Sequence, residues 1–177
     1  DDGNPGGGAT CEVPDKLGVC AEGTTRCDNA QLACDQTSFP AAEVCDGRDN
    51  DCDGAADEGY IFGGYLPPVD PSGDSIFRRR GTIPFKFRLT NCSGAVVSTA
   101  VARISVFFYA NTTVGTELED VTSVGQANTG DLYRFSAGEG QYIYNLDTKY
   151  FAAKKSYLVR TTLDDGSAPR DVIISFK

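Results

Sequence analysis

The cysteines are distributed unevenly along this chain, and their distribution most constrains how it folds. Six of the seven lie between residues 11 and 52 of a 177-residue chain, and the seventh is Cys92. The first 59 residues contain few large apolar side chains, namely Val13, Leu17, Val19, Leu32, Phe39 and Val44. A segment with so little apolar surface cannot offset its chain entropy by burial, so it needs cross-links.

Charge and aromatic content divide the chain at the same place. Residues 1–59 hold 14 acidic and three basic residues, a net charge of −11, whereas residues 60–177 hold 11 and 13, a net of +2. Seventeen of the 18 Phe and Tyr residues lie in the second part. We therefore predict a flexible Gly-rich lead-in at 1–10, a Cys-rich calcium-binding module at 11–59 and a β domain at 60–177.

The cysteine spacing favours disulfides over a zinc site, because zinc sites use more closely spaced pairs. Short loops suit a module with little core, so we expect sequential bridges: Cys11–Cys20, Cys27–Cys34 and Cys45–Cys52. Cys92 is then the odd cysteine. Three states are open for Cys92. It could be a buried free thiol, it could bond a cysteine of the first module, or it could bond another chain.

Cysteine usage also indicates an oxidising compartment. We predict a secreted protein, extracellular or at the cell surface, with Asp1 as the start of a processed chain. No apolar run is long enough to cross a membrane.

From residue 60 onward, apolar side chains recur at every second position. The runs are 83–89, 102–108, 142–146, 157–163 and 172–176. This period is typical of strands with one buried face. Together with the turn signals between the runs, it predicts a mainly β protein whose larger domain is an immunoglobulin-like β-sandwich.

Composition excludes several functions. The chain has no His, so it cannot form a Ser-His-Asp triad, a Cys-His pair or an imidazole metal site. Its net charge of −9 argues against nucleic acid as a partner. We expect no catalytic residues and no enzymatic activity.

The strongest chemical signal is an acidic loop between Cys45 and Glu58. Asp49, Asp51 and Asp53 alternate and are followed by Gly54, which matches a known calcium-loop pattern. Alternate carboxylates can surround Ca²⁺ from one side, and the glycine permits a sharp turn. The loop therefore predicts a bound Ca²⁺ rather than only a solvated acidic turn.

The loop departs from an EF-hand. An EF-hand places a bidentate Glu where this chain has Tyr60, and no helix pattern follows. We expect the remaining ligands to come from the backbone carbonyl of Ala55 and from the carboxylates of Asp57, Glu58 and Asp46.

Segments 18–27 and 40–58, with Cys34 between them, resemble the MopE-type metal-binding motif, which recurs in secreted and surface proteins of bacteria. The family takes its name from a copper-binding surface protein. Copper prefers imidazole, thiol or thioether ligands, and this chain has no His or Met. The residues present favour calcium.

The second part is similar to the PxKF domain of secreted microbial proteins. The likeness rests on segments 62–70, 81–87, 141–144 and 163–166, and it implies no catalytic activity. Members of that family tend to have a second cysteine where this chain carries Ser156. By this resemblance, Cys92 lacks its expected partner.

These features predict an extracellular calcium-binding structural protein, a surface or appendage building block that assembles into filaments by self-association or with other surface proteins. We interpret Arg78, Arg79 and Arg80 as a solvated strand end. An alternative role for them is contact with the acidic first module of the same or a neighbouring subunit. The alternative is an adhesion module that binds carbohydrate or protein through tyrosines of the segment 142–157.

Overall fold

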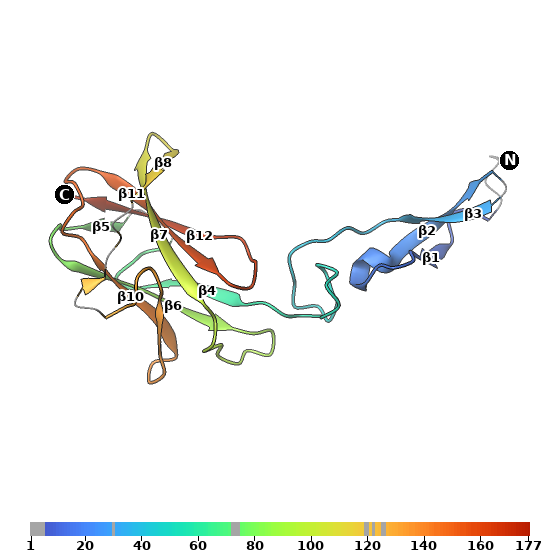
Figure 1. Ribbon diagram of the computed structural model, residues 1–177, viewed down its shortest axis with the longest axis horizontal. Coiled ribbons are helices and arrows are strands. Elements are labelled where there is room, and N and C mark those ends of the chain that lie inside the picture. The colour runs from blue at the N-terminus through green and yellow to red at the C-terminus, as the bar shows by residue number, and fades with distance from the viewer. Residues whose placement is uncertain (1–5, 30, 72–74, 119–120, 122, 125–126) are drawn as a thin grey trace. The chain divides into compact units, whose positions relative to one another are not determined.

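The computed structural model describes residues 6–29, 31–71, 75–118, 121, 123–124 and 127–177. The chain divides into two compact units, Asp1–Gly59 and Tyr60–Lys177. Strands are the main regular secondary structure in both units (Figure 1), so the mainly β prediction is confirmed. Among the described residues, no helix has the length and apolarity needed to cross a membrane.

The first unit contains one small antiparallel sheet of three strands in the order β1-β2-β3. Its elements are β1 (Thr10–Glu12), the 3-10 helix η1 (Gly18–Ala21), β2 (Glu22–Asp28) and β3 (Gln31–Gln36). Among its described hydrophobic residues, only Val19 and Cys20 are buried. The sheet therefore has almost no apolar core to hold it together.

Disulfides supply part of the missing stabilisation, and they do not join neighbouring cysteines. Cys11 bonds Cys34, and Cys20 bonds Cys52. The first bridge passes next to Gly23 of β2, where an added Cβ would lie 2.6 Å from the Cys34 sulfur. The missing side chain at position 23 is what lets a bridge join the two outer strands across the central one.

The predicted sequential bridges are thus wrong. Strand pairing places the Cys11 and Cys34 strands on either side of β2, whereas Cys20 lies on η1 beside the acidic loop. Cys45 and Cys92 are also disulfide-bonded. Cys92 is therefore not the odd cysteine, and the cysteine outside the disulfides is Cys27, half-buried on β2.

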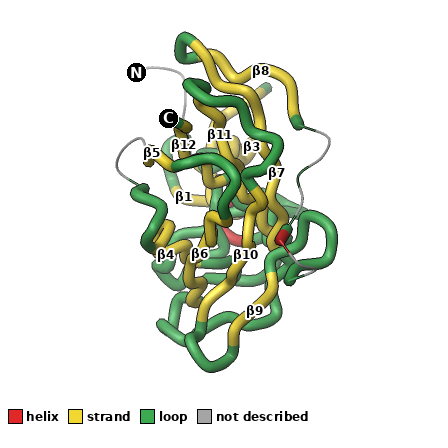
Figure 2. Tube along the Cα trace, turned by 90° about the vertical axis from the view of Figure 1, so that its left-hand side faces the viewer, coloured by secondary structure: helices red, strands yellow, loops and turns green. Residues whose placement is uncertain are grey.

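The second unit is formed by two sheets (Figure 1). One has the order β4-β6-β10-β9, and the other has the order β5-β12-β11-β7-β8. Figure 2 shows β6 and β10 side by side, as their antiparallel pairing requires. The strands are β4 (Ile61–Leu66), β5 (Ser75–Phe77), β6 (Thr82–Thr90), β7 (Ala102–Ala110), β8 (Thr113–Glu117), β9 (Arg134–Ser136), β10 (Gln141–Asp147), β11 (Ser156–Leu163) and β12 (Arg170–Phe176).

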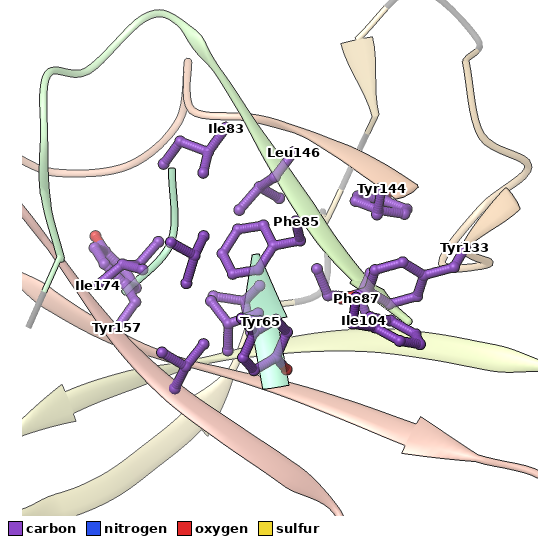
Figure 3. Close-up of a cluster of buried hydrophobic side chains, with 14 of the residues drawn as sticks. Tyr65, Ile83, Phe85, Phe87, Ile104, Tyr133, Tyr144, Leu146, Tyr157 and Ile174 are labelled. Carbon is purple, nitrogen blue, oxygen red and sulfur yellow. The ribbon is translucent and has the colours of Figure 1, made fainter. Parts of the chain in front are cut away.

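The core of this unit comes from the alternating residues (Figure 3). On β6, residues 83, 85, 87 and 89 are all buried, and the residues between them are not. The ring of Phe87 stacks on Tyr142 with centroids 5.2 Å apart and meets Tyr133 edge-on at 4.9 Å. One predicted core position differs, because Phe108 on β7 is 41% exposed.

A buried hydroxyl cluster links the two sheets inside this core. The Tyr65 hydroxyl on β4 lies 2.7 Å from the Thr161 hydroxyl on β11, and the Tyr133 hydroxyl lies 2.8 Å from the same oxygen. Tyr65 also donates to the carbonyl of Arg170 at 2.9 Å. Burial raises the pKa of Tyr65 and Tyr133, because it disfavours the charged phenolate.

Candidate metal site

The acidic loop is fastened to the first unit at its base. The Cys20–Cys52 bridge ties it to η1, and the N–H of Val19 donates to the carbonyl of Asp49 at 2.9 Å. Gly18 has a φ of +53°, and a Cβ there would lie 2.2 Å from the Asp49 carbonyl oxygen. Only glycine fits this close approach of the two backbones.

Inside the loop, carboxylates cap backbone N–H groups and curl the chain. Asp49 accepts from the N–H groups of Asp53 at 3.1 Å and Gly54 at 3.0 Å, one on each oxygen. Asp51 accepts from Asp53 at 3.2 Å, and Asp53 accepts from Ala55 at 2.9 Å. Gly54 takes a φ of +101°, the left-handed turn that the motif needs.

This curling brings three predicted ligands together. Asp49, Asp51 and Asp53 each offer a carboxylate oxygen, and these oxygens all lie within 4.8 Å of one another. No positively charged side chain forms a described ion pair with any of them. Like charges held so close favour a counter-cation.

A second triad shares Asp51 with the first. It consists of Glu43, Asp51 and Glu58, whose oxygens again lie within 4.8 Å of one another. Glu58 was predicted from the sequence, but Glu43 was not. Glu43 lies six positions before Asp49, the first acid of the alternating pattern, so that pattern does not include it. The one signal for Glu43 in the sequence was its place within the motif, between Pro40 and Cys45.

Glu43 is held in place by three backbone donors. Its Oε1 accepts from the N–H groups of Asn50 at 2.6 Å and Asp51 at 2.7 Å. Its Oε2 accepts from the N–H of Asp57 at 3.1 Å. One carboxylate thereby connects both arms of the loop.

The environment of Glu58 differs from that of Glu43. Each of its carboxylate oxygens exposes less than 1 Å² and accepts no hydrogen bond from another described residue. Its own backbone N–H acts to lower the pKa of the carboxyl. Burial and repulsion from Glu43, Asp53 and Asp51 nevertheless raise that pKa above its ordinary value.

The other predicted ligands lie in the loop but outside both triads. Asp57 accepts from the N–H groups of Asp46 at 2.9 Å and Gly47 at 2.8 Å. Asp46 accepts from the N–H of Arg48 at 3.0 Å, and Ala55 donates its own N–H to Asp53. The carboxylates of Asp46 and Asp57 therefore shape the loop. Metal ligation by these two carboxylates and by the backbone carbonyl of Ala55 stays a prediction.

The adhesion alternative relies on the tyrosines of the segment 142–157. Tyr142, Tyr144 and Tyr157 are each at most 1% exposed, so of these tyrosines Tyr150, which is 69% exposed, is available to a ligand. The second unit also presents positive charge. A surface cavity of about 710 Å³ is lined by Arg78, Arg79, Arg80 and Lys177.

Comparison with known families identifies the same loop. The family model for the Cu-binding MopE motif, described as a "Putative metal-binding motif", matches residues 39–58. The match includes both triads. Comparisons with curated proteins and with solved structures found no match. The motif and the disulfides together fit an extracellular metal-binding protein.

The donor set decides which metals the loop fits. Both triads consist of carboxylates alone, which are hard oxygen ligands. Copper sites use imidazole, thiolate or thioether donors, and the chain has no His or Met. The loop cysteines, Cys45 and Cys52, are disulfide-bonded and cannot act as thiolates. The residues fit a hard cation and do not fit copper.

Proposed function

We propose that this protein is an extracellular, non-catalytic structural protein whose acidic loop binds Ca²⁺. The observation that carries the proposal is the convergence of Asp49, Asp51 and Asp53 within 4.8 Å. Ca²⁺ takes six to eight oxygen ligands in flexible geometry, so a loop with several nearby carboxylates and backbone carbonyls suits it. Mg²⁺ demands a stricter octahedron and retains its waters more strongly.

Calcium binding here serves to stabilise the fold. The first unit has almost no apolar core, and its loop concentrates negative charge that repels itself in the absence of a cation. An ion that binds the folded loop but not the unfolded chain stabilises the fold by mass action. The loop ion and the disulfides would then act together as cross-links.

Calorimetric titration with Ca²⁺ tests this role. We expect saturable binding by the intact chain and a rise in the melting temperature of the first unit when calcium is added. Asp53→Asn keeps an oxygen for the N–H of Ala55 but removes a charge, so calcium affinity should fall at least tenfold. Asp15→Asn, an exposed acid outside the loop, is the matched control. A wild-type chain that binds no Ca²⁺ would refute the proposal.

We further propose that copies of the chain assemble head to tail. Charge complementarity supports this step, since the loop is strongly acidic and the cavity on the second unit is lined by Arg78, Arg79, Arg80 and Lys177. Contact between two different surfaces of identical chains produces open filaments when the rotation does not close. Calcium would set the charge that the loop presents to its neighbour.

Sedimentation velocity in excess calcium and again in chelator tests assembly. Large species are expected in calcium and should dissolve in chelator, because a bound ion would rigidify the loop that makes the contact. Arg78→Glu should abolish them, whereas Arg88→Glu, on the exposed face of β6 and outside the cavity, should not. A monomer at high concentration in both conditions would rule out assembly but leave calcium binding intact.

A further inference from the structure

The acidic loop contains a buried carboxylate that the three-aspartate site does not use. Both oxygens of Glu58 expose less than 1 Å² and accept no hydrogen bond from another described residue. Its own backbone N–H is the donor that acts on this carboxyl. A buried carboxylate whose bonding is this incomplete is costly, and proteins satisfy such groups by pairing or by metal coordination. A cation at Glu58 would supply the missing interaction.

The neighbours of Glu58 are suited to hold that cation with it. Glu43 and Asp51 place carboxylate oxygens within 4.8 Å of a Glu58 oxygen. Glu43 is already oriented by three backbone N–H groups, and its Oε2, which accepts one of them, keeps a second lone pair for an ion. A ligand fixed in this way loses little freedom when it coordinates an ion.

The five carboxylates form two triads that share Asp51, not a single cluster. Together Glu43, Asp49, Asp51, Asp53 and Glu58 carry five negative charges when ionised. One divalent cation would leave three of these charges uncompensated, and two would leave one. A carboxylate has two oxygens, so Asp51 can serve both triads.

We propose that the loop holds a second divalent cation, coordinated by Glu43, Asp51 and Glu58, with Asp51 bridging it to the ion of the three-aspartate site. The oxygen-only ligands make Ca²⁺ the expected ion. This inference rests on the proposed calcium site, because the two sites share a ligand. It adds that the loop is a two-ion cluster in which Glu43 and Glu58 serve only the second ion.

Stoichiometry separates the two proposals, measured by calorimetric titration with Ca²⁺ and by native mass spectrometry. The wild-type chain should bind two ions. Glu58→Gln should bind one, and Asp53→Asn should retain the ion at Glu43 and Glu58. Asp51→Asn should weaken both sites, and Asp15→Asn should still bind two ions.

Thermal unfolding gives a second readout that does not depend on counting ions. In excess chelator, Glu58→Gln should melt at or above the wild-type temperature, because it removes a buried charge that Glu43, Asp51 and Asp53 repel. In calcium, it should melt below wild type. A purely structural role for Glu58 predicts lower melting in both conditions and would overturn the second site.

The outcomes distinguish failure of one proposal from failure of both. One ion per wild-type chain, retained in Glu58→Gln, would refute the second site and leave the first in place. No ion in the wild-type chain would refute both. Two ions in the wild type and one in Glu58→Gln would support the two-ion loop.

Discussion

The two units of this chain contrast in what stabilises them. In the second unit, aromatic and aliphatic side chains from two sheets fill a continuous core. In the first, Val19 and Cys20 are the buried hydrophobic residues among those described, and two disulfides cross-link a small sheet and an acidic loop. A chain can thus combine a domain held by apolar burial with one held by covalent and ionic cross-links.

Truncation of a core side chain should give the largest loss in the free energy of unfolding, and this loss should be confined to the second unit. Phe87 is fully buried and its ring contacts Phe62, Tyr133 and Tyr142. Phe87→Ala should lower the free energy of unfolding of this unit by about 3–5 kcal/mol. Denaturant titration followed by circular dichroism measures the loss.

The matched control lies in the first unit, where Phe39 is 68% exposed. Phe39→Ala should change the free energy of unfolding by less than about 0.5 kcal/mol. Equal losses from the two substitutions would contradict the contrast between the units.

Removal of a disulfide should affect the first unit specifically. The Cys20–Cys52 bridge spans 32 residues, so Cys20→Ser with Cys52→Ser should cost that unit about 3–4 kcal/mol. Because this bridge holds the acidic loop against η1, Ca²⁺ affinity should fall as well. Hydrogen exchange resolved by residue reports each unit separately.

Cys11→Ser with Cys34→Ser provides the control, since this bridge spans 23 residues and lies in the sheet away from the loop. Its stability cost should be similar, about 3 kcal/mol, but calcium affinity should change less. If both pairs reduced calcium affinity equally, the bridge at Cys20 would have no special role at the loop.

Alkaline pH should lower the free energy of unfolding by a smaller amount, and this loss should be confined to the second unit. Burial, together with nearby Asp131, raises the pKa of Tyr144 to about 12, and burial raises that of Tyr65 and Tyr133. The contribution of each neutral, buried phenol to stability is fully present at pH values below the ordinary tyrosine pKa of about 10. That contribution is lost as the pH rises toward and through the higher value in the folded unit.

Tyrosinate absorbance and denaturant titration across this range measure the effect. The free energy of unfolding of the second unit should fall above a pH of about 10. Residues 1–59 contain no tyrosine, so the first unit gains no such dependence from phenols. Tyrosines that all titrate near the ordinary value would show that the core is not closed to water.

The sequence alone predicted the β character of the chain and the alternating core positions on β6, β10 and β12. The reason is physical, because side chains of a strand alternate between faces and a period of two is visible without any tertiary information. It also predicted the carboxylates at 49, 51 and 53, since the alternation of acids and the following glycine are local features of one short segment.

Tertiary structure decided what depended on residues far apart in the chain. Cys11 bonds Cys34 because strand pairing places Cys11 opposite Gly23 of β2 and Cys34 opposite Thr25, and no spacing rule could choose that pair. Glu43 joins the acidic loop because three backbone N–H groups hold its carboxylate against Asp51 and Glu58. Burial of Tyr142, Tyr144 and Tyr157 required two sheets to meet. Local pattern determines which atoms a segment offers, whereas strand pairing and packing determine which of them come together.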